Sequence, residues 1–165
     1  MKFDDYRISD EIKKSLNKLG FRKPTDIQFK AIPPIMKGED VLAIAQTGTG
    51  KTAAFAIPIL DRFQFSKNRR RDDGIKCVVM VPTRELAIQI TEVFNEIGRG
   101  TRVSAFSVFG GVEQGPQIAK LQDGIDILVA TPGRLLDLMA QKYVQPDKMY
   151  VLAVGNASEI SDKLK

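Results

Sequence analysis

Short apolar runs alternate with longer amphipathic stretches along the 165 residues of this chain. The apolar runs are continuous and rich in β-branched residues, which is typical of strands buried on both faces of a parallel sheet. Five of them occupy residues 41–45, 77–81, 103–108, 125–130 and 150–154. The amphipathic pattern predicts helices at residues 10–19, 25–36, 52–63, 85–97, 118–122 and 133–140.

This alternation predicts the α/β fold class. Right-handed βαβ connections would place helices on both faces of a mainly parallel sheet, giving a three-layer sandwich. The length fits one domain. Since ligands of open α/β sheets bind beyond the carboxyl ends of the strands, the residues that follow each strand are the candidates for function.

A glycine-rich segment follows the first apolar run and precedes a helical stretch. It reads Ala45-Gln46-Thr47-Gly48-Thr49-Gly50-Lys51-Thr52. This is the P-loop pattern, with Ala45 where the strict form has glycine. The glycines let backbone N–H groups turn toward phosphate oxygens at a helix N-terminus. We expect Lys51 to reach the β and γ phosphates of ATP and Thr52 to bind Mg²⁺. Kinases, GTPases, transporters and helicases share this loop, so it predicts a ligand rather than a reaction.

Composition adds few constraints. The chain is 43% hydrophobic and 27% charged, as in ordinary globular proteins, and it has no apolar run long enough to cross a bilayer and no signal-peptide pattern. We therefore expect a cytoplasmic protein without a membrane contact. The chain has no histidine, so catalysis would need carboxylates, lysine or a metal ion. The net charge of +5 suits a polyanionic partner without identifying one. The one cysteine, Cys77, is predicted to be a buried apolar residue, and the basic run at 67–73 a solvated loop.

The segment before the P-loop suggests a family. Phe3 and then Gly20-Phe21-Arg22-Lys23-Pro24-Thr25-Asp26-Ile27-Gln28 resemble the Q motif of DEAD-box ATP-dependent RNA helicases. The resemblance implies that Phe3, Phe21, Arg22, Pro24 and Gln28 recognise adenine. The chemistry is suitable, because a glutamine amide offers the donor and the acceptor that match the N6 and N7 edge of adenine. Aromatic and long cationic side chains can cover the faces of the base.

Further segments follow the later apolar runs in the order known from that family. They are Pro82-Thr83-Arg84-Glu85-Leu86, Gly110-Gly111 and Thr131-Pro132-Gly133-Arg134, which are similar to its PTREL, GG and TPGR segments. The resemblance implies that they hold the sugar-phosphate backbone of single-stranded or duplex RNA. Arginines, threonine hydroxyls and helix N-termini are phosphate ligands that do not distinguish bases.

The resemblance implies an N-terminal RecA-like domain over residues 1–165, with a Q-motif region at 1–36, a P-loop core at 37–154 and a divergent tail at 155–165. Where the family carries Asp-Glu-Ala-Asp, this chain has Gly155-Asn156-Ala157-Ser158. The acids of that motif hold Mg²⁺ through water and position the attacking water. Glu159 and Asp162 lie nearby but are displaced, and a solvated terminal helix is the simpler interpretation.

The Ser-Ala-Thr segment and the second RecA-like domain of the family are also not found, so we expect a truncated or degenerate first domain that is monomeric. Three hypotheses follow. The chain is an ATP-dependent RNA helicase domain that binds ATP and RNA with little hydrolysis alone, a non-catalytic nucleotide- or RNA-binding module, or a small-molecule kinase. The last leaves Gln28 and the PTREL and TPGR segments unexplained.

Overall fold

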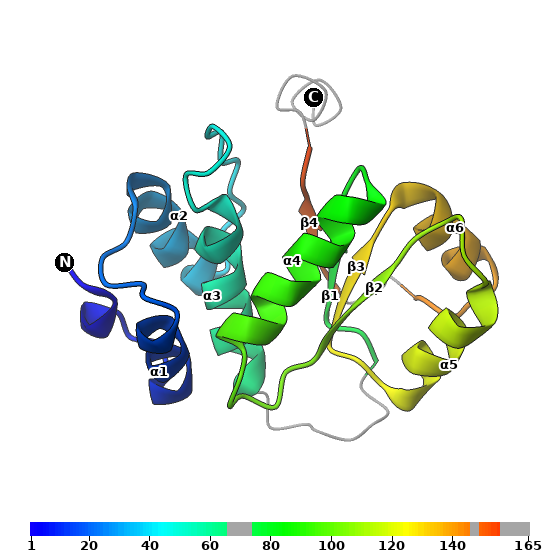
Figure 1. The fold of residues 1–165 in the computed structure, drawn as a ribbon, viewed down its shortest axis with the longest axis horizontal. Helices are drawn as coiled ribbons and strands as arrows, with labels where there is room; N and C mark the ends of the chain where they lie inside the picture. Colours follow the sequence, from blue (N-terminus) through cyan, green and yellow to red (C-terminus); the bar gives the residue numbers. More distant parts are fainter. Residues whose placement is uncertain (66–73, 146–148, 156–165) are drawn as a thin grey trace. The chain divides into compact units, whose positions relative to one another are not determined.

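The computed structural model describes residues 1–65, 74–145 and 149–155. Contacts within the chain divide it into two compact units. The first unit is Met1–Ser66 with Val93–Val103, and the second is Lys67–Glu92 with Ser104–Lys165. Figure 1 shows the elements of both units.

The second unit contains a parallel sheet. Its strands are β1 (Cys77–Met80), β2 (Ala105–Val108), β3 (Ile127–Ala130) and β4 (Tyr150–Ala153). They lie in the order β2-β3-β1-β4, and every neighbouring pair is parallel. The strands are in step, since Ile127 lies opposite both Cys77 and Ala105, and Tyr150 lies opposite Cys77. Their carboxyl ends therefore meet at one edge, and the α/β prediction is confirmed.

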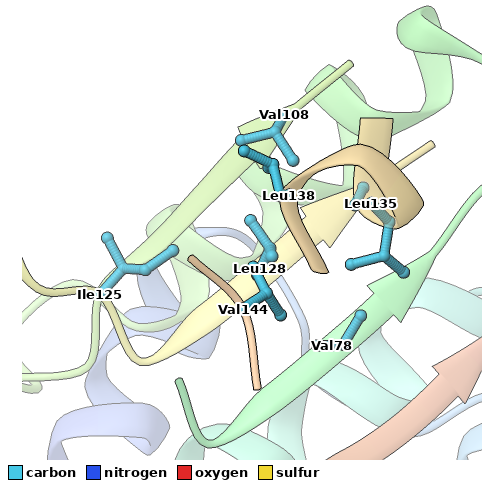
Figure 2. Packing of buried hydrophobic residues seen from close by; sticks show 8 residues of the cluster. Val78, Val108, Ile125, Leu128, Leu135, Leu138 and Val144 are labelled. Carbon is cyan, nitrogen blue, oxygen red and sulfur yellow. The ribbon is translucent and has the colours of Figure 1, made fainter. Parts of the chain in front are cut away.

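Helices α5 (Gln114–Asp123) and α6 (Pro132–Ala140) cover one face of this sheet. The cluster beneath them is formed by Val78, Val108, Ile125, Leu128, Ala130, Leu135, Leu138 and Val144 (Figure 2). The alternate residues Ile127 and Val129 are also fully buried, so β3 is buried along both of its faces. This explains its continuous apolar sequence, because each buried side chain of this size contributes about 1.5 to 3 kcal/mol.

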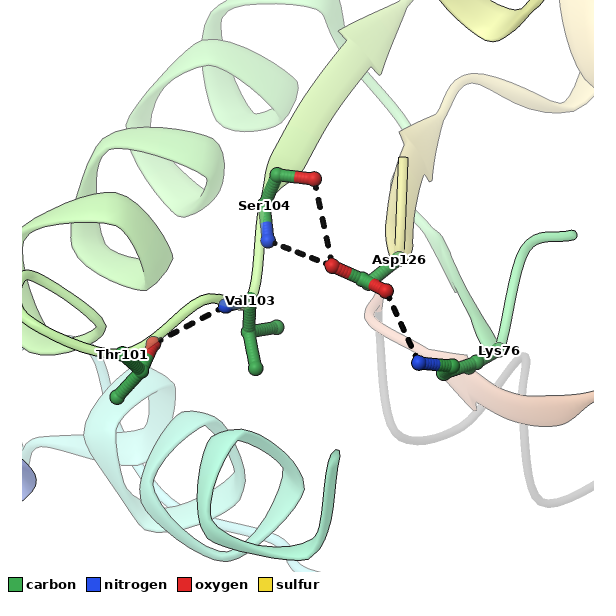
Figure 3. A network of polar contacts seen from close by, with 5 residues as sticks. All are labelled: Lys76, Thr101, Val103, Ser104 and Asp126. Atoms are coloured by element: carbon green, nitrogen blue, oxygen red, sulfur yellow. Dashed lines mark hydrogen bonds and ion pairs between the residues drawn. The ribbon is translucent and has the colours of Figure 1, made fainter. Parts of the chain in front are cut away.

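A polar network joins the amino ends of three strands (Figure 3). Asp126, just before β3, accepts hydrogen bonds from the backbone N–H and the hydroxyl of Ser104, at 2.9 and 3.4 Å. Its other carboxylate oxygen lies 3.1 Å from the Lys76 ammonium. Ser104 precedes β2 and Lys76 precedes β1, so one carboxylate fixes the ends of three neighbouring strands.

The first unit is helical. It contains η1 (Phe3–Asp5), α1 (Asp10–Lys18), α2 (Asp26–Lys37), α3 (Lys51–Gln64) and the last residues of α4 (Arg84–Ile97). The Ser9 hydroxyl caps α1 by accepting from the N–H of Ile12, while its own N–H donates to the Asp61 carboxylate of α3 at 2.8 Å. Capping thus also joins α1 to α3. The predicted helices are confirmed to within a few residues, and α5 begins four residues earlier than expected.

The prediction of a strand at residues 41–45 is wrong. The segment is not in the sheet, and its side chains are exposed, with Leu42 at 58% and Ile44 at 66%. An apolar run becomes a strand only where a neighbouring backbone offers N–H and C=O partners. No strand of the described residues pairs with it, so that part of the chain contains four strands rather than five.

Two smaller predictions concern Cys77 and the basic run. Cys77 is fully buried, and burial raises the pKa of its thiol to about 12, so it is the apolar core residue that was expected. The basic run at 67–73 lies outside the described residues. Among the residues that are described, no helix is long and apolar enough to cross a membrane.

Candidate functional site

The glycine-rich loop of the first unit leads directly into α3. Gly50 is the N-cap of that helix and has a φ of 86°, and Gly48 has a φ of 79°. Both values lie in the left-handed region that favours glycine. Helix α3 begins at Lys51, so the loop presents the N–H groups of a helix N-terminus, which suit a phosphate. The loop and helix of the predicted P-loop are therefore present, although the preceding strand is not.

Side chains inside the loop bond back to its own carbonyls. The Lys51 ammonium donates to the carbonyl oxygen of Ala45, six residues earlier. The Thr49 hydroxyl donates to the carbonyl oxygen of Gln46 at 2.7 Å. The loop therefore curls around the Lys51 ammonium, and a positive charge enclosed by a loop is suited to the oxygens of a polyphosphate. Lys51 and Thr52 are both half-buried.

Gln28 is joined to the loop. Its side chain is 1% exposed; the oxygen accepts the N–H of Thr25 at 3.0 Å and the nitrogen donates to the Gly50 carbonyl at 3.1 Å. The Thr25 hydroxyl donates to the carbonyl of Thr49 at 2.8 Å. The structure therefore brings the predicted adenine-recognition segment against the P-loop. Sequence reasoning missed this support of Gly50, although the Thr25-x-x-Gln28 capping-box spacing signals the first bond.

The two candidate aromatic residues of the Q-motif region differ in burial. Phe3 is buried, and its ring packs edge-on against Phe21 with centroids 6.2 Å apart. Phe21 and Pro24 are half-buried and Arg22 is exposed. Phe21 and Arg22 are thus accessible to a base, whereas Phe3 is buried against Phe21.

The remaining candidate residues lie in the second unit, at the carboxyl edge of the sheet. Three loops follow the neighbouring strands β2, β3 and β1, and they carry Gly110-Gly111, Thr131-Pro132-Gly133-Arg134 and Pro82-Thr83-Arg84. The loop after β1 starts α4, where the Thr83 hydroxyl accepts the N–H of Leu86 at 3.2 Å. The loop after β3 starts α6, with Pro132 in its first turn. Two helix N-termini therefore point to the edge where the exposed glycines lie.

Two arginines at this edge have fixed partners. The Arg84 guanidinium lies 4.8 Å from the centroid of the Phe109 ring. Arg134 donates to the side-chain oxygen of Gln117 at 2.8 Å and to the carbonyl of Val112 at 3.0 Å. A guanidinium has five N–H groups, so Arg134 keeps donors for a ligand. Neither Phe109 nor Gln117 was identified from the sequence, because a lone phenylalanine or glutamine carries no pattern.

This arrangement of loops, strands and helices has known counterparts. Residues 25–163 match the family model described as "DEAD/DEAH box helicase". The chain belongs to this family. The resemblance inferred from the motifs is thereby confirmed, and the kinase hypothesis has no support.

Similar proteins agree with this DEAD-box assignment. The chain is 37% identical over 160 residues to "DEAD-box ATP-dependent RNA helicase 30" of Arabidopsis thaliana, covering 97% of this chain and 27% of that protein. It is also 37% identical over 158 residues to "DEAD-box ATP-dependent RNA helicase CshA" of Bacillus subtilis, covering 96% of this chain and 31% of that protein. The chain thus spans about a third or less of the length of these relatives.

Solved structures of DEAD-box proteins share the fold. A crystal structure of a DEAD box protein from the hyperthermophile Methanococcus jannaschii aligns with a TM-score of 0.84 and 34% identity, over 99% of this chain and 43% of that one. A hypothetical ATP-dependent RNA helicase from Sulfolobus tokodaii aligns with a TM-score of 0.80 and 34% identity, over 95% of this chain and 44% of that one. The RecA-like fold class is therefore shown.

The acidic position of the DEAD-box family is altered in this chain. Gly155 lies two residues after the end of β4, which pairs with β1, at the carboxyl edge of the sheet. Residues 156–158, Glu159 and Asp162 lie outside the described part. Within that part, no group of three or more His, Cys, Asp or Glu side chains could hold a metal ion. In the first unit, the Thr52 hydroxyl at the start of α3 is an oxygen ligand suited to a Mg²⁺ ion that also binds the phosphates of a nucleotide.

Proposed function

We propose that this chain is the N-terminal RecA-like domain of an ATP-dependent RNA helicase, which binds adenine nucleotide in the first unit and the RNA backbone in the second. The observation that carries the RNA half is the placement of three family segments at one edge of a parallel sheet. Exposed glycines, helix N-termini and two arginines there offer donors to phosphates without contacts that read bases.

The nucleotide half rests on the loop at residues 45–52. Its N–H groups and Lys51 bind the phosphates, and Thr52 binds the Mg²⁺ that accompanies them. When bound, Mg²⁺ neutralises phosphate charge. Besides its bonds to Thr25 and Gly50, the Gln28 amide has a second N–H and a second oxygen lone pair, which are the donor and the acceptor that match adenine. Because Gln28 also holds Gly50, the base site and the phosphate site share one side chain.

A second candidate is a binding module that holds nucleotide and RNA without turnover. The glycine at position 155 favours it, since the family has its first carboxylate at this place. Without acids there, no group of the motif positions water for attack on the γ-phosphate. We expect the chain by itself to bind both ligands and to hydrolyse ATP very slowly.

Titration calorimetry with ATP tests the proposal. The change Lys51→Ala should weaken ATP binding by about 1.5 to 3 kcal/mol, the range for a lost charge-assisted hydrogen bond. Lys120→Ala, an exposed lysine of α5, is the control and should bind ATP like the parent. GTP should compete poorly with ATP. Equal affinity in the Lys51 variant and the parent would remove the P-loop from the mechanism.

RNA binding is tested separately by fluorescence anisotropy with a labelled single strand. Binding should be independent of base sequence and should weaken steeply as salt is added, because phosphate contacts release counterions. A strong preference among strands of equal length would contradict backbone recognition. The monomeric state and the cytoplasmic location stay predictions.

A further inference from the structure

The two candidate RNA-binding arginines of the second unit are joined through one buried amide. Gln117 of α5 is 6% exposed, and both ends of its side chain are bonded. Its oxygen accepts from Arg134 at 2.8 Å, and its nitrogen donates to the carbonyl of Phe109 at 3.2 Å. The bonds connect α5, the start of α6 and the loop after β2.

The same loop supports the second arginine. Phe109 uses its carbonyl to bond Gln117 and its ring to contact Arg84 at 4.8 Å. Three residues further, the carbonyl of Val112 accepts a second hydrogen bond from Arg134 at 3.0 Å. Any shift of the loop therefore changes the supports of both arginines.

The tip of this loop, at residues 110–112, is exposed. A hollow of about 450 Å³ lies beside it, and its lining includes Arg84, Phe109, Val112 and Gln117. Gly110 and Gly111 at the tip are exposed, and a side chain added at either would meet open space. Since the tip of the loop is exposed, its hydrogen bonds to Gln117 and Arg134 constrain its position. A shift of the loop would leave the buried Gln117 amide without a partner, which costs free energy.

We propose that Gln117 is a positioning residue for RNA binding: it holds the loop at 109–112 and the Arg134 guanidinium in one arrangement, in which Arg134 and, through Phe109, Arg84 face phosphates. The role needs a side chain that accepts from a guanidinium and donates to a carbonyl at the same time. Glutamine does both, whereas glutamate lacks the donor and methionine lacks both groups. This inference rests on the proposed RNA binding.

The test uses the full chain and a fluorescein-labelled strand of ten uridines, with binding measured at several salt concentrations. Gln117→Met should weaken binding about tenfold and reduce the slope of log affinity against log salt by about one, as expected when a phosphate contact is lost. Gln114→Met is the matched control on the same helix; the Gln114 nitrogen is buried without a hydrogen-bond partner in the structure, so RNA binding should be unchanged.

A double-mutant cycle separates positioning from general destabilisation. If Gln117 acts through Arg134, Gln117→Met should cost much less in an Arg134→Met background than in the parent. ATP affinity, which belongs to the other unit, should be the same in all variants. Additive losses with an unchanged salt slope would overturn the inference, as would parent-like binding by Gln117→Met.

Two further outcomes stay interpretable. Should Gln117→Met fail to unfold cooperatively, Gln117→Asn replaces it, since the shorter amide cannot span both partners; parent-like RNA binding by that variant would also overturn the inference. Absence of RNA binding by the parent would instead contradict the proposed function itself.

Discussion

Gly50 is the residue where three structural requirements of the glycine-rich loop coincide. It is the N-cap of α3, it has a positive φ of 86°, and its carbonyl accepts a hydrogen bond from the Gln28 side chain. A Cβ at this position would lie against the Gln28 nitrogen and 3.2 Å from the Thr25 hydroxyl oxygen. The residue therefore has to be glycine for its backbone and for its neighbours.

Gly50→Ala should accordingly destabilise the chain more than Gly48→Ala. Gly48 has a similar φ of 79° but open space around it, so alanine there adds only backbone strain of about 1 to 2 kcal/mol. At Gly50, loss of the Gln28 contacts should add about 1 to 3 kcal/mol. Urea unfolding of the two variants measures the difference, and equal free energies would show that Gln28 does not depend on this glycine.

The sequence could predict Gly50 but not its partner. The P-loop pattern places glycine, lysine and threonine at fixed spacings because they are neighbours along the chain. The bonds of Gln28 to Gly50 and of Gln117 to Phe109 join residues from different segments. Such contacts depend on how segments meet in space, which no local spacing records.

At the scale of elements, the apolar pattern predicted all four strands of the sheet, including the largely exposed edge strand β4. β1 and β3 lie inside the sheet and their apolar sequences identified them. Residues 41–45 have the same kind of sequence and form no strand. The difference lies in the hydrogen-bond partner, which is a property of another part of the chain.

The register of β1, β2 and β3 should depend on Asp126. Asp126→Asn removes the charge that Ser104 and Lys76 share and should lower the free energy of unfolding by about 1 to 3 kcal/mol. Lys76→Met removes the ion pair alone, which is partly exposed, and should cost less than about 1 kcal/mol. Denaturant unfolding at neutral pH compares them. A larger loss for the lysine variant would assign the stabilisation to the ion pair instead of the backbone contact.

At the scale of the whole molecule, the chain lacks the carboxylates that the family has at residues 155–158. The P-loop belongs to the first unit, whereas Gly155, at the acidic position of the family, follows β4 in the second. With Thr52 as the protein ligand, Mg²⁺ should contribute little to ATP affinity. Hard cations of this kind prefer carboxylates and water, so acids at the family positions should restore the dependence.

The triple change Gly155→Asp, Asn156→Glu and Ser158→Asp tests this. ATP binding by the triple variant should tighten measurably when Mg²⁺ is added, while binding by the parent should change little. Calorimetric titration with and without Mg²⁺ measures both proteins, and a phosphate-release assay accompanies it. RNA-stimulated phosphate release by the unchanged chain would contradict this account and direct attention to Glu159 or Asp162.

The strand order also gives the carboxyl edge a direction. Along it lie first a pair of glycines after β2, then the Pro132 helix start with Arg134 after β3, and then Thr83 and Arg84 after β1. The three loops differ in their residues, so the two ends of this row of loops are not equivalent. An RNA strand is also directional, because its 5′ and 3′ ends differ and all of its sugars are oriented the same way along it. A strand bound along these loops in the reverse direction would present its sugars and phosphates to each loop in the opposite orientation. A protein surface blind to the order of bases would thus still distinguish the polarity of the chain that carries them.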